Sequence, residues 1–301
     1  VGTFGGGVRA LAVGKDGWLA AGSMAGELRL WAPGKDMPTP RSLLSSGAPV
    51  VAVAFAPFRP LLAAAGKDGT VRVWDLERLE APPLSITTGG AAVASLAFGP
   101  QRFEAGVATT DQTLLAGTPK GALLWQLWRP EAPPLTVCGA SDVRGIAFSP
   151  RLALLACGER NGGIVVQPFA GLVPGGGVQR FVGHASSVNA LAFGPRGESL
   201  VSASSDGTVR LWNARDKAKP PVVLSGHESW VWTVAFSPDG AHLVSGGADR
   251  TVRVWPAGGE ALAREICARG FPPLSEEEWR SFLPENLPYH PEHACSVLSL
   301  E

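Results

Sequence analysis

The most constraining feature of the chain is a pattern that recurs roughly every 43 residues. Its clearest copies are Gly183-His184 followed by Trp212, and Gly226-His227 followed by Trp255. In both copies the Trp ends a short apolar run, Thr-Val-Arg-Leu-Trp or Thr-Val-Arg-Val-Trp. Equivalent runs end at positions 31, 74, 125, 167, 212 and 255, with Gln in place of Trp at 167. This spacing is typical of a four-stranded propeller blade.

A second motif, a strand that ends in Phe-x-Pro, precedes the Trp run in five of the units. These motifs are Phe55-Ala56-Pro57, Phe98-Gly99-Pro100, Phe148-Ser149-Pro150, Phe193-Gly194-Pro195 and Phe236-Ser237-Pro238. Pro ends a strand because it cannot donate a hydrogen bond to the neighbouring strand. The 38 Gly and 26 Pro among 301 residues also suit many short strands joined by turns. The pattern predicts an all-β fold in a single repeat domain.

On these motifs the chain resembles the WD-repeat β-propeller family over about residues 1–256, most specifically in the last two units. The resemblance implies six four-stranded blades, with the last blade closed by a strand from residues 1–4. A seventh blade, lying outside this sequence or replaced by part of the tail, is the alternative. The expected units span residues 5–45, 46–88, 89–137, 138–181, 182–224 and 225–256.

The family stabilises each blade with a hydrogen-bonded set of His, Ser or Thr, Asp and Trp. By residue match, the full set occurs only twice, as His184, Ser202, Asp206 and Trp212, and as His227, Ser245, Asp249 and Trp255. Unit two keeps Asp68 and Trp74 but has Ser46 at the His position. We therefore expect structural roles for these residues and uneven polar networks around the ring.

After Trp255 the repeat pattern ends and a tail begins, at residues 257–301. Residues 260–269 and a segment opened by the capping box Ser275-Glu276-Glu277-Glu278 are predicted to form short helices that pack on the propeller. The second carries Trp279, Phe282 and Leu283. The tail resembles the one that follows WD repeats in large bacterial multidomain proteins, including signal-transducing NTPases. That resemblance implies a module upstream of Val1, and the absence of an initiator Met there agrees with it.

Composition narrows the possible partners and compartments. Formal net charge is zero, with 26 basic and 26 acidic residues, so nucleic acid is not an expected partner. No apolar run is long enough to span a membrane, so no membrane partner is expected either. Four cysteines, Cys138, Cys157, Cys267 and Cys295, lack the spacing of a disulfide framework or a zinc ribbon. We expect free thiols in a reducing, cytoplasmic environment.

Motifs for catalysis are missing from the sequence. It contains no Walker loop, no nucleophile elbow, no His-Glu-x-x-His and no EF-hand loop. The carboxylates at the Asp position of the repeat, Asp68, Asp206 and Asp249, are expected to have structural roles in the blades. No enzyme activity, cofactor or metal site is therefore expected.

Function is expected on one face of the ring. In WD-repeat relatives, ligands often meet residues that flank the first Val of each inner strand, and the residue before the network Asp. Transferred by position, these candidates are Arg9, Met24, Lys67, Asp142, Arg144, Arg160, Asn189, Trp230 and Trp232. Large aromatic side chains on an accessible rim are typical anchors of protein interfaces.

These candidates suggest a site for a protein or peptide segment. Trp230 and Trp232 would form its apolar anchor, and the basic residues would attract acidic groups. The competing interpretation is that both Trp side chains plug the channel or pack under the tail, and contribute only stability.

Three classes of function follow. The first is a noncatalytic sensor or regulatory propeller at the C-terminus of a larger bacterial signalling protein. Its ligand could then be an upstream module of the same polypeptide. The second is a free-standing scaffold. The third, an enzyme with a funnel active site, would need carboxylates or His converging on the channel, where only Asp142 is expected.

Overall fold

The computed structural model describes residues 3–14, 17–34, 39–45, 47–99, 102–104, 107–109, 113–139, 141–149, 151–170, 173–174 and 177–257. All regular secondary structure in these ranges is β-strand, so the expected all-β class is confirmed. The helices expected in the tail, and the cysteines Cys267 and Cys295, lie outside the described residues.

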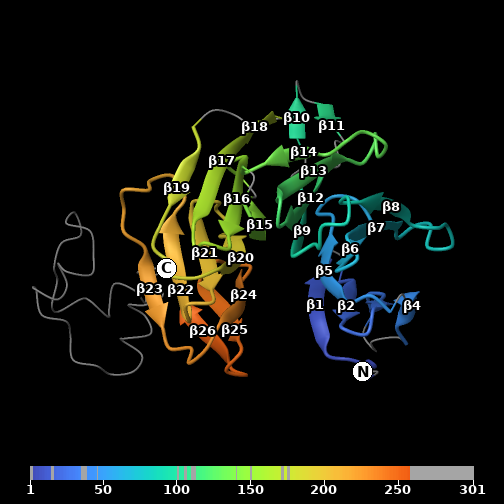
Figure 1. Ribbon diagram of the computed structural model, residues 1–301, viewed down its shortest axis with the longest axis horizontal. Helices are drawn as coiled ribbons and strands as arrows, with labels where there is room; N and C mark the ends of the chain where they lie inside the picture. The colour runs from blue at the N-terminus through green and yellow to red at the C-terminus, as the bar shows by residue number, and fades with distance from the viewer. Residues whose placement is uncertain are drawn as a thin grey trace, which may run out of the picture.

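Six antiparallel sheets stand as blades around a central axis (Figure 1). Blades one and two are regular four-stranded sheets. Their strands are β1 (Val8–Val13), β2 (Leu19–Ser23), β3 (Glu27–Trp31), β4 (Arg41–Ser45), β5 (Val50–Phe55), β6 (Leu61–Gly66), β7 (Thr70–Asp75) and β8 (Leu84–Thr87).

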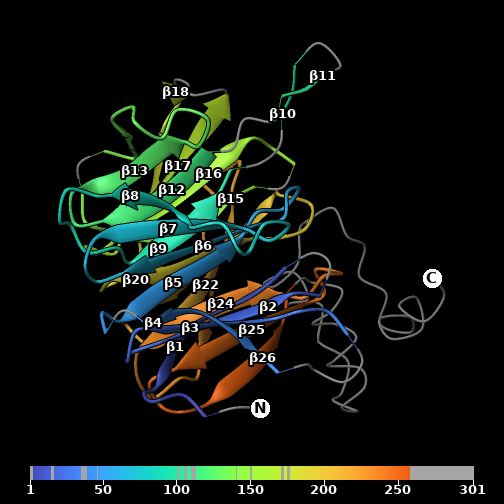
Figure 2. The same cartoon turned by 90° about the vertical axis from the view of Figure 1, so that its right-hand side faces the viewer.

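Blades three and four each carry an addition to this plan. Blade three consists of β9 (Ser95–Phe98), β12 (Thr113–Thr118), β13 (Gly121–Gln126) and β14 (Leu135–Val137). Between β9 and β12 the hairpin of β10 (Arg102–Glu104) and β11 (Val107–Thr109) stands out from the ring (Figure 2). Blade four consists of β15 (Val143–Phe148), β16 (Leu154–Glu159), β17 (Ile164–Ala170) and β19 (Gln179–Phe181), with β18 (Val173–Pro174) paired to the end of β17.

Blades five and six follow the clearest sequence repeats. Blade five consists of β20 (Val188–Phe193), β21 (Ser199–Ser204), β22 (Thr208–Asn213) and β23 (Val222–Ser225). In blade six the described residues form three strands, β24 (Val231–Phe236), β25 (His242–Gly247) and β26 (Val252–Pro256).

The apolar core lies in layers between neighbouring blades. In blade five, Val188 and Leu191 of β20 are buried in one cluster with Ala147 and Ala156 of blade four. The second strand of a blade is rich in small residues, as in the buried run Ala63-Ala64-Ala65 of β6. Small side chains there let adjacent sheets approach to the usual spacing of about 10 Å. The core therefore depends on each blade having a neighbour on both sides.

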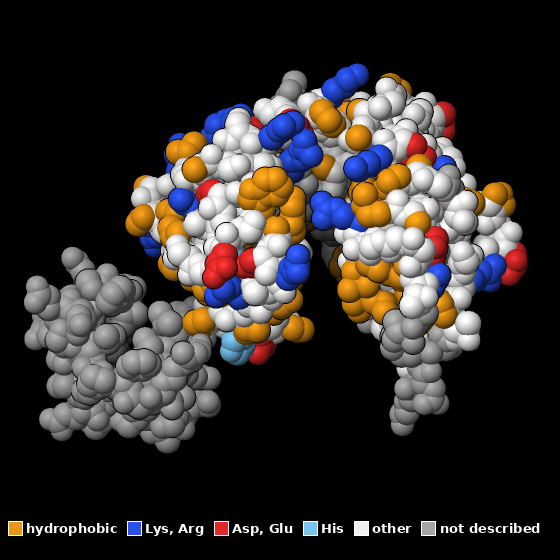
Figure 3. Space-filling view, turned by 60° about the horizontal axis from the view of Figure 1, so that its bottom comes forward, with side chains coloured by type: hydrophobic (Ala, Val, Ile, Leu, Met, Phe, Trp, Pro, Cys, Tyr) orange, Lys and Arg blue, Asp and Glu red, His pale blue; other side chains and the backbone are white. Residues whose placement is uncertain are grey.

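The ring formed by the described residues is open between blade six and blade one. Inner strands of consecutive blades pack closely from β1 and β5 round to β20 and β24, but no comparable packing joins β24 to β1. The space-filling view shows a hollow there, with apolar side chains on its sides (Figure 3). The two ends of the propeller thus face each other across a gap.

The expected closure by residues 1–4 is not seen in the described part of the chain. No described residue adds a fourth strand to blade six, and Phe4 instead lies against Trp31 of blade one, with ring centroids 6.4 Å apart. The Gly5 amide donates to Glu27 of β3, which holds the segment on blade one. The N-terminal segment stays on blade one because its contacts with Trp31 and Glu27 hold it there.

The expectation of free thiols is wrong for two of the four cysteines. Cys138 and Cys157 form a disulfide in blade four. Their 19-residue separation has no recognisable spacing, but pairing of β16 and β17 brings Cys157 beside the loop that carries Cys138.

Candidate functional site

Blades five and six each contain a four-residue hydrogen-bond chain, which we call the clamp. In blade five, Trp212 Nε1 donates to Ser202 Oγ at 2.8 Å, Ser202 Oγ lies 2.7 Å from His184 Nε2, and His184 Nδ1 lies 2.7 Å from Asp206. A carboxylate can only accept, so His184 donates from Nδ1 and accepts at Nε2. Blade six repeats the chain with Trp255, Ser245, His227 and Asp249. Each clamp joins two strands, a turn and the preceding loop of its blade.

The electrostatics of the clamp favour a neutral His beside an ionised Asp. Burial raises the pKa of the Asp206 carboxyl, but hydrogen bonds from Thr208, His184 and the Ala185 amide outweigh it and lower that pKa to about 2. Burial also lowers the pKa of His184, and its bond to Asp206 offsets this only in part. Both groups are held in a single protonation state near neutral pH, which suits a structural role rather than acid–base catalysis.

Blade four replaces the clamp by a covalent bond. By strand register, Cys138 and Cys157 occupy the positions held in blade five by Gly183 and Ser202. The disulfide therefore joins the loop before the blade to its second strand, as the His184–Ser202 bond does in blade five. Sequence reasoning missed this replacement, although the match of Cys157 to the clamp Ser was readable from the repeat alignment.

Blade one replaces the clamp by a glutamate. Glu27 accepts a hydrogen bond from the Gly5 amide at 3.0 Å and pairs with Arg29 at 2.7 Å. The Gly5 amide contact lowers the pKa of Glu27, and Arg29 adds to this effect. The arrangement corresponds to the bond from the Ala185 amide to Asp206 in blade five. A residue of a different type, two positions later and at the start of β3, thus serves the same purpose.

A repeated β-bulge positions the predicted face residues of the inner strands. The register of the first two strands shifts between Val8 and Ala10, and at the equivalent step in four other blades. The residue left unpaired at each step is Arg9, Val51, Arg144, Asn189 or Trp232. Bulges re-aim side chains and are frequent beside functional sites. Four of the nine candidates therefore share one structural device.

The other candidates lie on turns tied to the same place by a backbone hydrogen bond. The amides of Met24, Lys67 and Arg160 donate to the carbonyls of Gly7, Pro49 and Asp142. In blade six the Ala248 amide donates to the Trp230 carbonyl at 2.7 Å. The nine candidates consequently lie on one face of the ring, which we call the rim.

Three rim residues gather beside the opening of the ring. Trp230 is 53% exposed, and its ring meets that of Trp232 edge to face, with centroids 5.3 Å apart. The guanidinium of Arg9, from the opposite end of the propeller, lies 5.2 Å from the Trp232 ring centroid. This cluster, which we call the aromatic site, combines a large apolar surface with a cation.

Other rim residues are not arranged as the sequence suggested. Asp142 pairs with Arg144 at 2.9 Å and lies 3.5 Å from Arg160, so part of the expected positive charge is neutralised locally. Asn189 donates to Ser205 and to the carbonyl of Val231, and bridges blades five and six. Lys67 and Met24 are exposed on blades two and one. The aromatic site therefore stands apart from the basic residues of blade four.

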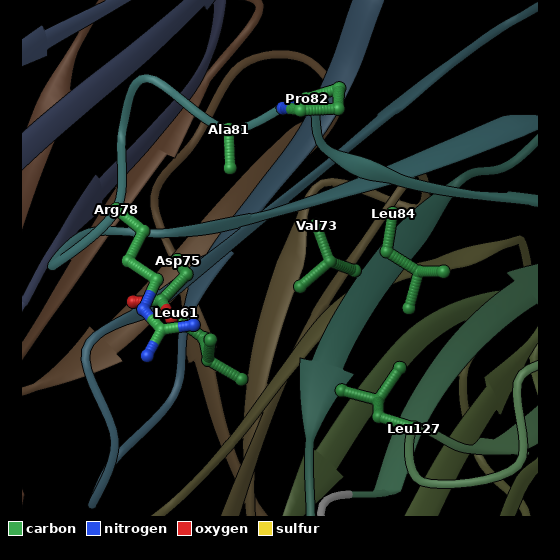
Figure 4. A pocket seen from close by; sticks show the side chains of 8 residues that line it. All are labelled: Leu61, Val73, Asp75, Arg78, Ala81, Pro82, Leu84 and Leu127. Carbon is green, nitrogen blue, oxygen red and sulfur yellow. The ribbon is translucent and has the colours of Figure 1, made fainter.

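A pocket that sequence reasoning did not find lies between blades two and three. Its volume is about 220 Å³, and most of its lining is apolar (Figure 4). The lining residues are Leu61, Val73, Asp75, Arg78, Ala81, Pro82, Leu84 and Leu127. Seven of them come from residues 61–84 of blade two, and Leu127 follows the third strand of blade three, so the pocket forms only where the two blades meet.

In the ranges that the structure describes, no three His, Cys, Asp or Glu side chains cluster in a way that could hold a metal ion. The same ranges contain no helix long and apolar enough to cross a membrane.

Comparison with known families agrees with this geometry. The family model "WD domain, G-beta repeat" matches residues 40–75, 176–213 and 218–256. The chain contains WD40 repeats. Each matched segment begins at or before the outer strand of one blade and ends at the third strand of the next, so the WD40 repeats and the blades are offset by one strand. Two of the three matches cover the blades with complete clamps. No curated protein matches the chain.

Proposed function

We propose that this propeller recognises a protein or peptide segment without catalysing a reaction. WD40 propellers typically act as protein-interaction scaffolds, and the described rim offers binding surface rather than a constellation of reactive groups. The observation that carries the proposal is the aromatic site, where an exposed Trp230 meets Trp232 edge to face and the guanidinium of Arg9 lies over the Trp232 ring. Aromatic anchors beside Arg are the side chains that contribute most at protein interfaces.

The chemistry of the aromatic site favours a ligand with an apolar side chain next to a carboxylate. Trp230 supplies an exposed apolar ring, while Arg9 supplies a charge that a carboxylate can pair with. Lys67 adds a further exposed cation on the rim. Blade four attracts a carboxylate less strongly, because Asp142 pairs with Arg144 and Arg160 and neutralises part of their charge.

Substitution of Trp232 tests the proposal. Peptides selected for binding from a random displayed library should lose at least tenfold in affinity for Trp232→Ala. They should bind Trp128→Ala normally, because Trp128 is exposed on blade three, away from the site. The unfolding free energy of Trp232→Ala should stay within about 1 kcal/mol of the parent. Equal binding by both variants, or loss of folding, would favour a purely structural role for the Trp pair.

We further propose that the propeller is the C-terminal sensor or regulatory domain of a larger bacterial signalling protein. The support is the tail sequence, with its Leu-Ser-Glu-Glu-Glu-Trp and Phe-Leu-Pro segments at residues 274–279 and 282–284. In that setting the ligand could be an upstream module of the same polypeptide. An upstream catalytic module whose turnover is unchanged by deletion of the propeller would argue against regulation.

A scaffold that holds two proteins is the second candidate, and the pocket between blades two and three favours it. This apolar pocket could take a side chain of another partner while the aromatic site is occupied. Substitution of Leu84 by Arg should then remove one partner and leave peptide binding at the aromatic site intact.

The proposed compartment is the cytoplasm, as expected for a signalling module. The Cys138–Cys157 disulfide is the observation against it, because disulfides persist mainly in oxidising compartments. Thiol trapping in intact cells decides the matter: a fully oxidised pair would contradict a cytoplasmic location.

A further inference from the structure

The first side of the ring opening is an apolar sheet face without a partner. Val252 and Val254 of β26 are 74% and 65% exposed, although both lie inside a regular sheet. At the equivalent positions in blade five, Val209 is fully buried and Leu211 is half-buried against blade six. The face of blade six is thus built like an interface between blades, and nothing described covers it.

The second side is formed by blade one and repeats the observation. Leu11 and Val13 of β1 are 63% and 71% exposed. Their counterparts in blade two, Val53 and Phe55, pack in a cluster with the apolar residues of blade one. We call the space between β26 and β1 the open slot. Its two walls expose several apolar side chains side by side, and contiguous apolar surface of this kind marks a place where another segment binds.

The free outer edge of β26 is the third property of the open slot. Five blades have a fourth strand on their third, but within the described residues β26 pairs only with β25. Unpaired strand edges and apolar faces both favour association with another segment. The occupant must therefore be about one layer thick and apolar on two sides.

We propose that the tail of this chain, residues 258–301, docks in the open slot and fills the place of a seventh blade. The tail leaves the propeller directly after β26, at the wall of the slot, and its 44 residues match the length of one repeat unit. Because it is tethered there, its local concentration far exceeds that of a free partner.

The composition of the tail fits the walls of the slot. Its two predicted helices carry Leu262, Ile266, Trp279, Phe282 and Leu283. A helix has a diameter of about 10 Å, close to the spacing between packed sheets, so one layer of helices has the thickness of one blade.

Charge also favours this occupant. Residues 258–301 contain eight acidic and three basic side chains, so the 26 acidic and 26 basic residues of the chain divide into a tail of net charge −5 and a propeller of net charge +5. Arg9 of β1 and Arg250 of the turn between β25 and β26 lie on elements that border the slot. A long-range attraction between the two parts follows.

Hydrogen exchange of the full chain tests the proposal. In the intact protein, β26 and β1 should exchange within tenfold of their counterparts β22 and β5. The variant Trp279→Ala/Phe282→Ala/Leu283→Ala should accelerate exchange of β26 and β1 at least tenfold, with β22 and β5 unchanged. The control Arg280→Ala/Ser281→Ala, between the apolar positions, should behave as the parent. Rapid exchange of β26 and β1 in the parent, or exchange indifferent to the triple variant, overturns the proposal.

Crosslinking supplies a second measurement that does not depend on stability. A short bismaleimide should join Leu11→Cys, on the far wall, to Cys267 of the tail within one molecule. Val222→Cys, on the exposed outer strand of blade five, is the matched control and should crosslink at least tenfold less. Equal yields overturn the proposal, and crosslinks between molecules would assign the slot to a second copy instead. Both results are independent of peptide binding at the aromatic site.

Discussion

At the residue scale, the number of hydrogen bonds that a clamp carboxylate accepts determines how much it contributes to the stability of the fold. Asp206 accepts from His184, from the Ala185 amide, and from both the amide and hydroxyl of Thr208. Asp68, at the same position in blade two, accepts from the Thr70 amide and lies 3.7 Å from Arg72. Removing a buried hub leaves several polar groups without partners, and each costs about 1–3 kcal/mol.

We therefore expect Asp206→Ala to lower the unfolding free energy by about 3 kcal/mol, and Asp68→Ala by about 1 kcal/mol or less. Urea unfolding of the two variants measures the difference directly. Asp249→Ala serves as a second test, since its hydrogen-bond set repeats that of Asp206. Equal midpoints for Asp68→Ala and Asp206→Ala would show that the His contributes nothing to these networks.

The residues of the two complete clamps could be predicted because they repeat in type and spacing. The substitutes were missed, because Glu27 and the Cys138–Cys157 pair use other chemistry to join the same segments, although Cys157 stands where the repeat has the clamp Ser. Likewise, Trp230 and Trp232 could be placed on the rim from the repeat, but the pairing of Asp142 with Arg144 depends on side-chain directions that a pattern does not contain.

At the scale of elements, blade four depends on a covalent bond where blades five and six depend on hydrogen bonds. The chain-entropy model assigns about 3 kcal/mol to a disulfide that closes a loop of this length. Reduction should therefore lower the unfolding free energy of the parent by about that amount, measured by urea unfolding with and without a phosphine reductant. Cys157→Ser should be equally destabilised and should no longer respond to the reductant. A response that survives in Cys157→Ser would place the redox effect elsewhere in the chain.

Repeat spacing predicted the blades, and it also contained a signal for their one large insertion. The interval from Trp74 to Trp125 is the longest in the chain, and the extra residues form the β10–β11 hairpin. Closure of the ring left no such signal. Whether the segment around Phe4 pairs with β26 or stays on blade one depends on competing contacts, here those with Trp31 and Glu27.

At the scale of the whole molecule, the two complete clamps lie side by side in blades five and six, so acid should not loosen the ring evenly. Asp206 has a folded-state pKa of about 2, below its ordinary value of 3.8, and the stability it contributes is present above 3.8 and lost as the pH falls toward 2. The pKa of His184 is also lowered in the folded state, so folding is disfavoured once the pH falls below 6.5, where the unfolded His takes up a proton. Both groups therefore lower the unfolding free energy as the pH falls.

We expect exchange protection of β21 and β22, corrected for the intrinsic pH dependence of exchange, to fall between pH 6.5 and pH 3 by a larger factor than that of β6 and β7. Blade two lacks a complete clamp and is the internal control. The variant Asp206→Asn/His184→Gln, which keeps polar side chains but removes both titrating groups, should reduce the difference between the blades. A loss of protection that is uniform from blade one to blade six would mean that the propeller responds to acid as one cooperative unit, through its total charge and not through its clamps.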